Sequence, residues 1–287
     1  MRELLVLSGK GGTGKTSIMA SFAALCGDAV LVDCDVDAAN LHLVVHCEKG
    51  AANEFIASRK AEIDTSRCSG CGKCGAACRF QAVDGYTVDR MSCEGCGLCV
   101  RVCPEGAIKM VDCVSGHWFH SMTPYGPLMH ARLLAGEGNS GKLVSALRDR
   151  ARQVAESAGK GMIILDGPPG IGCPVLASMA GVSLVVLVTE PTVSGLHDFG
   201  RILKVCKDFN VRTVACINRF DLDEGISKKI EARCCKKGTP VVGRVPVDRD
   251  VIEAIVHGMP VVEYSDGPAA TAIRDLWRNV QEAFMRD

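Results

Sequence analysis

Gly9-Lys10-Gly11-Gly12-Thr13-Gly14-Lys15-Thr16 stands between a short apolar segment and a helical pattern. A glycine-rich loop in this position, ending in Gly-Lys-Thr, is typical of a loop that binds phosphate groups. The glycines let backbone N–H groups curl around phosphate oxygens at the start of a helix. We expect Lys15 to reach the β and γ phosphates and the Thr16 hydroxyl to bind magnesium. The nucleotide contacts predicted in this loop are those of Gly11, Gly12, Thr13, Gly14, Lys15, Thr16 and Ser17.

Outside one cysteine-rich stretch, short apolar runs alternate with helical patterns, which is the order of a parallel sheet with crossover helices. The runs are almost continuously apolar, as expected of strands buried on both faces. The predicted strands are Glu3–Ser8, Ala29–Asp33, Met162–Asp166, Leu184–Thr189, Thr213–Asn218 and Val241–Val245. The predicted helices are Thr16–Leu25, Gly141–Ser157, Ser194–Phe209, Ile226–Cys235, Asp248–His257 and a last one from Pro268. The expected fold class is α/β, with a doubly wound and mainly parallel sheet.

Composition narrows the class of protein further. The chain has 287 residues, of which 47% are hydrophobic, and this suits one large core with a small second domain. Its formal net charge is zero, without a long run of Lys or Arg, so we expect no nucleic-acid partner. The start lacks the pattern of a signal peptide, and no stretch has the length of a membrane span. These features favour a cytoplasmic location.

The last predicted helix carries one apolar stripe. Ile273, Leu276, Val280 and Phe284 follow one another at spacings of three and four. Such a stripe usually packs on the core, and the alternative is a helix that lies on a membrane surface. Acidic and basic residues mix on the other face, and this favours the core.

Eight of the 17 cysteines form an internal repeat between Cys68 and Cys103. The members of the first run recur in the second at a constant offset of 25 residues. The first run is Cys68, Cys71, Cys74 and Cys78, and the second is Cys93, Cys96, Cys99 and Cys103. In a reducing compartment such thiols are kept for metals rather than for disulfides. Zinc is one interpretation, but the ligands of a zinc site come in spaced pairs. Three cysteines, each three residues after the one before, instead surround an iron-sulfur cubane.

Both runs resemble the Cys-x-x-Cys-x-x-Cys-x-x-x-Cys run of bacterial ferredoxins, and the second also has the following proline, Pro104. The resemblance implies two 4Fe-4S clusters, each completed by the fourth cysteine of the other run. One set is then Cys68, Cys71, Cys74 and Cys103, and the other is Cys93, Cys96, Cys99 and Cys78. Two short strand-like pieces, Gln81–Val83 and Ala107–Val111, and a turn at Asp84-Gly85 accompany the runs. We expect an inserted α+β ferredoxin-like domain over residues 62–112, within an ATPase domain formed by residues 1–61 and 113–287.

Lys10 sets the phosphate loop apart from an ordinary P-loop. A second lysine near the start of the loop resembles the deviant Walker A loop of the MinD, Mrp and nitrogenase iron protein superfamily. In that superfamily the equivalent lysine reaches the nucleotide of a partner subunit. The resemblance therefore implies an ATP-dependent homodimer, or a heterodimer with a related ATPase, in which Lys10 and Lys15 both serve catalysis.

The resemblance continues through three aspartates that follow predicted strands. It implies that Asp33 and Asp166 join Thr16 around the magnesium ion, and that Asp35 orients the attacking water. The first two lie in segments similar to switch I, Asp33 to Leu41, and switch II, Asp166 to Gly170. Aspartates at the carboxyl ends of parallel strands suit ligand binding, because ligands gather at that edge. The alternative is an ordinary helix cap or turn.

The adenine site is expected later in the chain. The segment Cys216-Ile217-Asn218-Arg219 resembles the adenine-reading strand end of the superfamily, and Arg244-Val245-Pro246-Val247-Asp248 resembles the loop on the other side of the base. The resemblance implies that Asn218, Pro246 and Asp248 contact the base, although Asp248 is equally well placed to cap a helix.

The two parts together resemble MinD-superfamily ATPases with an inserted ferredoxin domain. Residues 121–131 and 136–142 look like a recurring signature of that group, without an assigned chemical role. His117, His120 and His130 lie in or beside the first segment, as loop or surface histidines or as ligands. Cys173 follows switch II at a spacing similar to that of a cluster-binding cysteine of the nitrogenase iron protein, and a buried or helix-starting thiol is the alternative.

Three functions are compatible with this pattern. The first is a nucleotide-gated electron carrier that acts on a redox partner protein. The second is an iron-sulfur carrier of the Mrp type that delivers clusters to a partner, although residues after Met259 lack the cysteine pair of that group. The third is a regulatory, MinD-like ATPase whose clusters are structural or sense oxidation.

Overall fold

The computed structural model describes residues 1–48 and 50–285, which form two compact units. The first unit comprises Met1–Ala52, Trp118–Ala131 and Ser140–Asp287. The second comprises Asn53–His117 and Arg132–Asn139, and it contains the eight cysteines of the repeat. The unit around the cysteines is therefore longer than the stretch 62–112.

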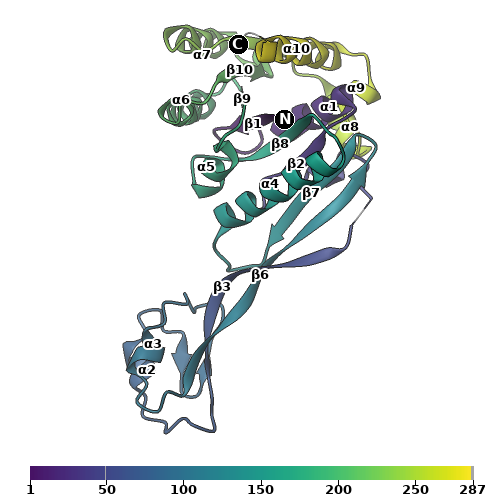
Figure 1. Cartoon of the computed structure of the whole chain (residues 1–287). Helices are drawn as coiled ribbons and strands as arrows, with labels where there is room; N and C mark the ends of the chain where they lie inside the picture. Colours follow the sequence, from purple (N-terminus) through teal and green to yellow (C-terminus); the bar gives the residue numbers. More distant parts are fainter. Residues whose placement is uncertain (49, 286–287) are drawn as a thin grey trace. The chain divides into compact units, whose positions relative to one another are not determined.

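A central sheet contains the strands of the first unit and continues into three strands, β7, β6 and β3, that lie partly or mostly in the second (Figure 1). Its strands follow the order β11-β10-β9-β1-β8-β2-β7-β6-β3, and the pairings among β11, β10, β9, β1, β8, β2 and β7 are parallel. The bounds are β1 Arg2–Ser8, β2 Val30–Asp33, β3 Ala52–Ile63, β6 Ile108–Thr123, β7 Gly126–Leu133, β8 Met162–Pro169, β9 Leu184–Thr189, β10 Thr213–Asn218 and β11 Val241–Val245. The predicted α/β class with a mainly parallel sheet is confirmed.

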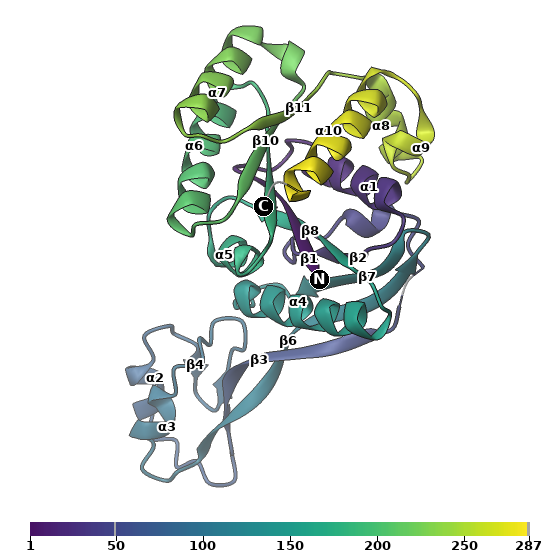
Figure 2. The ribbon, with the colours of Figure 1, turned by 45° about the horizontal axis from the view of Figure 1, so that its top comes forward.

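Helices cover both faces of the parallel strands (Figure 2). On one face α1 and α10 pack against the sheet, joined by α8 and α9, while α4, α5 and α6 lie on the other with α7 beside α6. The bounds are α1 Lys15–Cys26, α4 Ser140–Ser157, α5 Cys173–Met179, α6 Val193–Asp208, α7 Glu224–Lys236, α8 Arg249–Val256, α9 Val261–Tyr264 and α10 Pro268–Met285, with 3-10 turns η1 Leu41–Leu43 and η2 Phe220–Leu222. This two-sided cover is the doubly wound arrangement.

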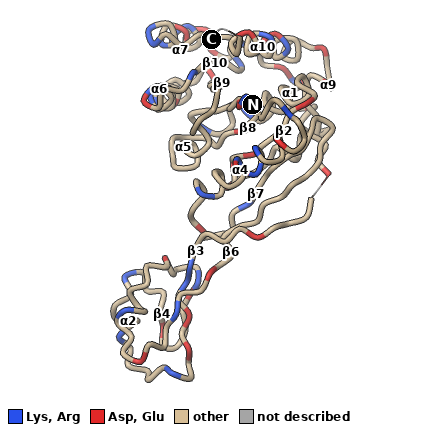
Figure 3. Tube along the Cα trace, viewed as in Figure 1, with Lys and Arg blue, Asp and Glu red and all other residues tan. Residues whose placement is uncertain are grey.

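The core of the first unit explains why these segments form strands. The strands β1, β2 and β9 are buried at nearly every position, because helices cover both of their faces. Phe22 of α1 and Trp277 of α10 meet at 5.0 Å between ring centroids. The predicted apolar stripe of the last helix is buried in this core, and basic and acidic residues mix on the rest of α10 (Figure 3).

All six predicted strands are present, with ends that differ by a few residues. The sequence did not reveal β7, and it gave only the first part of β6, which runs for 16 residues. The small hairpin is shifted by one residue from the expected turn, since Asp84 ends β4 and Gly85 and Tyr86 connect it to β5. Gly85 has a φ of 55°, which glycine adopts at low cost.

The second unit has little apolar surface to bury. It contains two five-residue helices, α2 Lys73–Ala77 and α3 Leu98–Val102, and a two-stranded sheet of β4 Val83–Asp84 and β5 Thr87–Val88. Its apolar cluster has four buried members, which are Ala61, Ala82, Cys93 and Ile108. A core of this size supplies limited stability, so further cross-links are needed.

None of the helices in the described part of the chain combines the length and apolarity needed to cross a bilayer.

Glu3 of β1 makes a buried ion pair that ties the sheet to α4. Its carboxylate oxygens lie 2.5 Å from Arg148 Nη2 and 2.5 Å from Arg152 Nε, and Arg148 also donates to the carbonyl of Ala177 at 2.7 Å. Although burial favours the protonated form, the hydrogen bonds from Arg152 and Arg148 hold the pKa of Glu3 below its usual value. Arg148 is only 4% exposed, so its charge depends on this partner.

Glu3→Gln should therefore lower the free energy of unfolding of the first unit by about 3 kcal/mol, because it leaves a buried arginine without its counter-charge. The measurement is urea denaturation at pH 7. Asp275→Asn is the matched control, since Asp275 and Arg278 form an exposed pair on α10, and it should change stability by about 0.5 kcal/mol or less. Equal effects of the two variants would contradict the buried role of Glu3.

Candidate functional site

A cavity of about 590 Å³ opens at the carboxyl ends of the parallel strands. The phosphate loop forms one wall, and residues from the ends of β2, β8, β10 and β11 form the others. The lining residues named by the sequence are Gly11, Gly12, Thr13, Gly14, Lys15, Thr16, Ser17, Asp35, Asn218, Pro246 and Asp248. The structure thus brings the loop, the predicted water-orienting aspartate and the predicted adenine contacts to one cavity.

Lys15 and Thr16 both contact the carboxylate of Asp166. Lys15 Nζ lies 2.6 Å from Asp166 Oδ1, and the Thr16 hydroxyl donates to Oδ2 at 2.8 Å. Burial alone favours neutral Lys15, but the Asp166 carboxylate raises the pKa of Lys15 above its usual value. The ammonium group is therefore charged and held at the base of the loop.

Asp33 lies beside this pair and is completely buried. Burial first, and then the negative charge of Asp166, raise the pKa of Asp33 above its usual value. One of its oxygens accepts from the backbone N–H of Asn40 and of Leu41, both at 3.0 Å. A cation near Asp33 and Asp166 would reduce the repulsion between the two carboxylates, and a bound magnesium ion would supply such a cation.

Asn40 connects the phosphate loop to switch I. Its side-chain oxygen accepts from the Thr16 hydroxyl at 3.2 Å, and it immediately precedes η1. Asp35, in the same segment, has a pKa raised above its usual value mainly by burial.

Two features of the phosphate loop fit a bound phosphate. Thr13 Oγ1 is buried and has no hydrogen-bond partner within the described residues. Gly14 has a φ of 83°, and a Cβ at this position would lie 2.2 Å from Asn218 Nδ2. Asn218 donates to the carbonyl of Thr13 at 2.7 Å, so its amide supports the loop from β10. Glycine is required at position 14 both by its φ and by this close approach.

The far wall of the cavity is apolar and comes from α8 and the loop before it. Val251, Ile252 and Ile255 line it together with Pro246. Asp248 caps α8, because its Oδ1 accepts from Asp250 N at 3.0 Å, and its Oδ2 accepts from Ala269 N at 3.0 Å. The helix-cap alternative for Asp248 is thus present in the structure, and the residue also borders the cavity.

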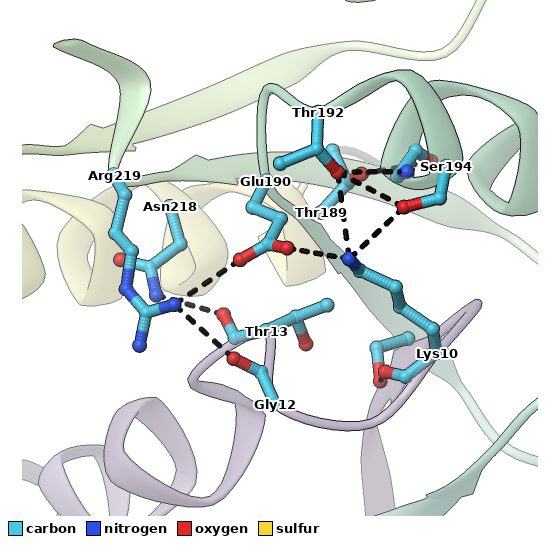
Figure 4. Close-up of polar contacts among 11 residues, drawn as sticks. Lys10, Gly12, Thr13, Thr189, Glu190, Thr192, Ser194, Asn218 and Arg219 are labelled. Carbon is cyan, nitrogen blue, oxygen red and sulfur yellow. Dashed lines mark hydrogen bonds and ion pairs between the residues drawn. The ribbon is translucent and has the colours of Figure 1, made fainter. Parts of the chain in front are cut away.

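Lys10 is held by side chains of its own chain (Figure 4). Its Nζ lies 2.6 Å from Glu190 Oε1, 3.2 Å from Ser194 Oγ and 3.4 Å from Thr192 Oγ1. The three partners follow the end of β9 and begin α6. Sequence analysis missed Glu190, although a carboxylate at the carboxyl end of a parallel strand is the signal that identified Asp33 and Asp166.

Glu190 also binds a second cation. Arg219 Nη1 lies 3.1 Å from Glu190 Oε2 and 3.3 Å from the carbonyl oxygen of Gly12 (Figure 4). Arg219 has a φ of 53°, an uncommon value for a residue with a side chain. A single carboxylate therefore links Lys10, Arg219 and the backbone of the phosphate loop.

The cysteines of the second unit line two cavities. Four cysteines border each cavity, three from one run and the last from the other. The first cavity is lined by Cys68, Cys71, Cys74 and Cys103, and the second by Cys93, Cys96, Cys99 and Cys78. This is the crossed combination that the ferredoxin resemblance predicts.

The two crossing cysteines have equivalent surroundings. Cys78 Sγ accepts from the backbone N–H of Ala82 at 3.4 Å, and Cys103 Sγ accepts from that of Ala107 at 3.3 Å. The repeat thus extends from sequence to hydrogen bonding. No group of three or more His, Cys, Asp or Glu side chains in the described part of the chain is arranged to hold a metal ion.

The remaining candidates differ in burial. Cys173 is exposed and begins α5. His120 is exposed and His117 is half-buried on β6, whereas His130 of β7 is buried and stacked between His42 and Phe119. The interpretation of these histidines as loop or surface residues is therefore wrong for His130.

Comparison with known proteins identifies the family. Residues 4–261 match the model of the CobQ/CobB/MinD/ParA nucleotide binding domain. The chain belongs to this family. It is 30% identical, over 98% of its length and 96% of the relative's, to an uncharacterized protein of Methanocaldococcus jannaschii. An iron-sulfur cluster carrier protein of Pyrococcus horikoshii is 32% identical over 40% of this chain and 43% of its own length.

Solved structures of this family share the fold. The cell division ATPase MinD of Pyrococcus furiosus superposes with a TM-score of 0.58 at 18% identity, covering 98% of this chain and 99% of that one. Membership in the CobQ/CobB/MinD/ParA family, together with such neighbours, indicates that the chain is an ATPase.

His130 should make the stability of the first unit sensitive to acid. Burial, with a smaller contribution from His42, lowers the pKa of His130 to about 4. A histidine whose pKa is lowered by folding stabilises the folded state fully above the unfolded pKa of about 6.5. That contribution should be lost as the pH falls from about 6.5 towards 4.

The measurement compares urea denaturation of the wild type and His130→Phe at pH 7 and pH 4.5. Phenylalanine keeps a flat ring but does not titrate, so the wild type should lose more stability between these pH values than the variant. His120→Phe, which changes an exposed histidine of β6, is the control and should behave as the wild type. Parallel losses in the wild type and His130→Phe would show that His130 is not kept neutral by its surroundings.

Proposed function

We propose that this ATPase is a nucleotide-gated electron-transfer protein that carries two 4Fe-4S clusters and acts on a redox partner protein. The observation that carries the proposal is the sorting of eight cysteines into two four-cysteine cavities within a chain whose other unit holds a phosphate loop. Neither a switching ATPase alone nor a simple ferredoxin alone needs both units on one chain.

The residues around the two cavities fit cubane clusters. Each iron of a cubane takes its own thiolate, so the four cysteines that line each cavity could each bind a different iron of one cluster. The N–H groups of Ala82 and Ala107 would stabilise the thiolates of Cys78 and Cys103. When bound, the clusters supply reversible one-electron transfer. The inserted domain is accordingly proposed to be ferredoxin-like.

The phosphate loop is proposed to bind ATP and ADP with Mg²⁺. The backbone of Gly11 to Gly14 would surround the phosphates, and Lys15 would move from Asp166 towards them. Thr16, Asp33 and Asp166 would hold Mg²⁺, which neutralises phosphate charge. Asp35 would orient the attacking water. These roles are supported by Gly11 to Gly14, Lys15, Thr16 and Asp35, which line one cavity. Asp166 contacts Lys15 and Thr16 behind that lining, and Asp33 holds the backbone of Asn40 and Leu41.

The base is proposed to lie between β10 and α8. The Asn218 side chain would either give up its hydrogen bond to the Thr13 carbonyl or keep it while it also binds the adenine edge. Pro246 and the apolar face of α8 would cover the ring. Asp248 would contribute through its cap of α8, which fixes the loop that carries Pro246.

Dimer formation is proposed to depend on Lys10. In the described chain Glu190 holds Lys10, so a partner subunit's nucleotide would have to compete with this carboxylate. Arg219 would then keep Glu190 paired, and this lowers the cost of releasing Lys10. The partner subunit is either a second copy or a related ATPase.

A second candidate function is supported by one comparison. The match to an iron-sulfur cluster carrier protein covers 40% of this chain. If the chain delivers clusters, holo-protein mixed with an apo-ferredoxin should lose iron to it in an ATP-dependent way. The electron-transfer proposal expects the iron to stay with the chain.

Anaerobically purified protein should contain about eight iron and eight sulfide per chain. Cys103→Ser and Cys78→Ser should each impair a different cluster, because the two residues line different cavities. Electron paramagnetic resonance after dithionite reduction would resolve the two signals. Cys113→Ser, which changes a buried cysteine of β6 outside both cavities, is the control and should leave both signals unchanged. Loss of one and the same signal in both variants would refute the crossed ligand sets.

Binding of a non-hydrolysable ATP analogue should shift the cluster midpoint potentials, by about 60 mV for tenfold coupling. Redox titration with and without the analogue measures this shift. Lys15→Met should bind the analogue weakly and show no shift, with unchanged iron content. A wild-type potential that does not respond to saturating analogue would refute nucleotide gating.

A further inference from the structure

Two segments of the sequence, residues 121–131 and 136–142, have no part in either site described above. In the structure the first contributes His130 on β7, and the second contributes Glu137 to the loop before α4. Each makes buried contacts with a strand that continues into the cysteine unit.

His130 is the middle ring of a stack of three. Its ring centroid lies 5.3 Å from that of His42, at an interplanar angle of 12°, and 4.9 Å from that of Phe119, at 16°. Its Nε2 is 3.0 Å from the hydroxyl of Ser121. Phe119 and Ser121 belong to β6. At the other end of β6, Ile108 packs in the apolar core of the second unit together with cysteines that line the two cavities.

His42 connects this stack to switch I. It lies in η1, directly after Asn40 and Leu41, whose N–H groups both donate to Asp33. Asn40 also accepts from Thr16. A change of ligand at Thr16 or Asp33 therefore acts on the short turn that presents His42 to His130.

Glu137 connects β3 to the start of α4, and α4 in turn lies beside the segment that follows switch II. It pairs with Lys60 at 3.1 Å and accepts from Ser58 Oγ at 2.9 Å, and both of these residues lie on β3. Lys60 is only 6% exposed, so this pair resists separation better than a surface pair. The chain continues from Glu137 into α4 within a few residues.

The start of α4 packs against the segment that follows switch II. A Cβ at Gly141 would lie 3.3 Å from the Cβ and the carbonyl oxygen of Cys173, so the start of α4 lies close against the start of α5. Cys173 follows Gly170 of switch II by three residues. A displacement of switch II would therefore shift Cys173 against Gly141 at the start of α4. The backbone from residue 137 to residue 140 would pass this shift on to Glu137.

We propose that His130 and Glu137 are positioning residues that tie the two nucleotide switches to the strands β6 and β3 of the cysteine unit. The inference rests on the proposed nucleotide gating and names its route: His42 and His130 for switch I, Gly141 and Glu137 for switch II. Neither residue touches nucleotide or cluster.

Thermodynamic linkage gives a test that does not depend on turnover. If nucleotide changes the reduction equilibrium, then reduction must change nucleotide affinity by the same factor. The experiment measures the Kd of a non-hydrolysable ATP analogue for oxidised and for dithionite-reduced holoprotein. In the wild type the two values should differ by about fivefold or more.

His130→Ala and Glu137→Gln should each bring this ratio closer to one, and the double variant should bring it to one. Iron content and the affinity of the oxidised form should remain close to those of the wild type. His130→Phe, which preserves the stacked ring, should retain most of the coupling, and this separates positioning from simple loss of packing. The matched controls are His120→Ala, at an exposed histidine of β6, and Glu62→Gln, at an exposed ion pair of β3 with Lys109.

The outcomes separate the two proposals. A ratio of one in the wild type overturns nucleotide gating and this route with it. A wild-type ratio that persists unchanged in the double variant leaves gating intact and shows that His130 and Glu137 do not carry it. Should His130→Ala fail to fold, His130→Phe with Glu137→Gln tests the Glu137 contact alone, with the same readout.

Discussion

The buried ion pair between Lys15 and Asp166 is the constraint that orders the nucleotide site. It joins the phosphate loop after β1 to the end of β8 at 2.6 Å, in an interior where an unpaired charge would be costly. Asp33 adds a second carboxylate to the same interior, and its pKa is raised first by burial and then by the negative charge of Asp166. Such a site favours additional positive charge, which agrees with the membership of the chain in a family of nucleotide-binding domains.

The second unit depends on a different constraint. Its apolar cluster has four buried members, and its two helices have five residues each. A unit with so small a core gains stability from cross-links, and the proposed clusters would supply them through the eight thiols around the two cavities. The crossed sets also join the first cysteine run to the second, so that neither half of the repeat is complete alone.

The sequence predicted those parts of the structure that are encoded locally. The phosphate loop, the six apolar strands and the cysteine spacing are patterns within a few residues, and each could be interpreted without knowledge of the rest. The partners of Lys10 could not be found in this way, because Glu190 and Arg219 come from the ends of two strands that only the sheet order makes neighbours. β7 was missed for a similar reason, since its sequence includes Gly126, Pro127 and His130, and its place as a strand comes from pairing with β2, which is distant in sequence.

The position of β7 gives the proposed nucleotide gating a backbone path along the sheet. β7 pairs in parallel with β2, and β2 ends at Asp33. β6 is the next strand of the same sheet, and it continues without interruption from Thr123 to Ile108. A flexible loop inserted in this place would absorb any displacement at the switches, whereas a hydrogen-bonded strand transmits it along the backbone. The insertion therefore joins the chain next to the strand that ends at Asp33, and β2, β7 and β6 are successive hydrogen-bonded neighbours in one sheet.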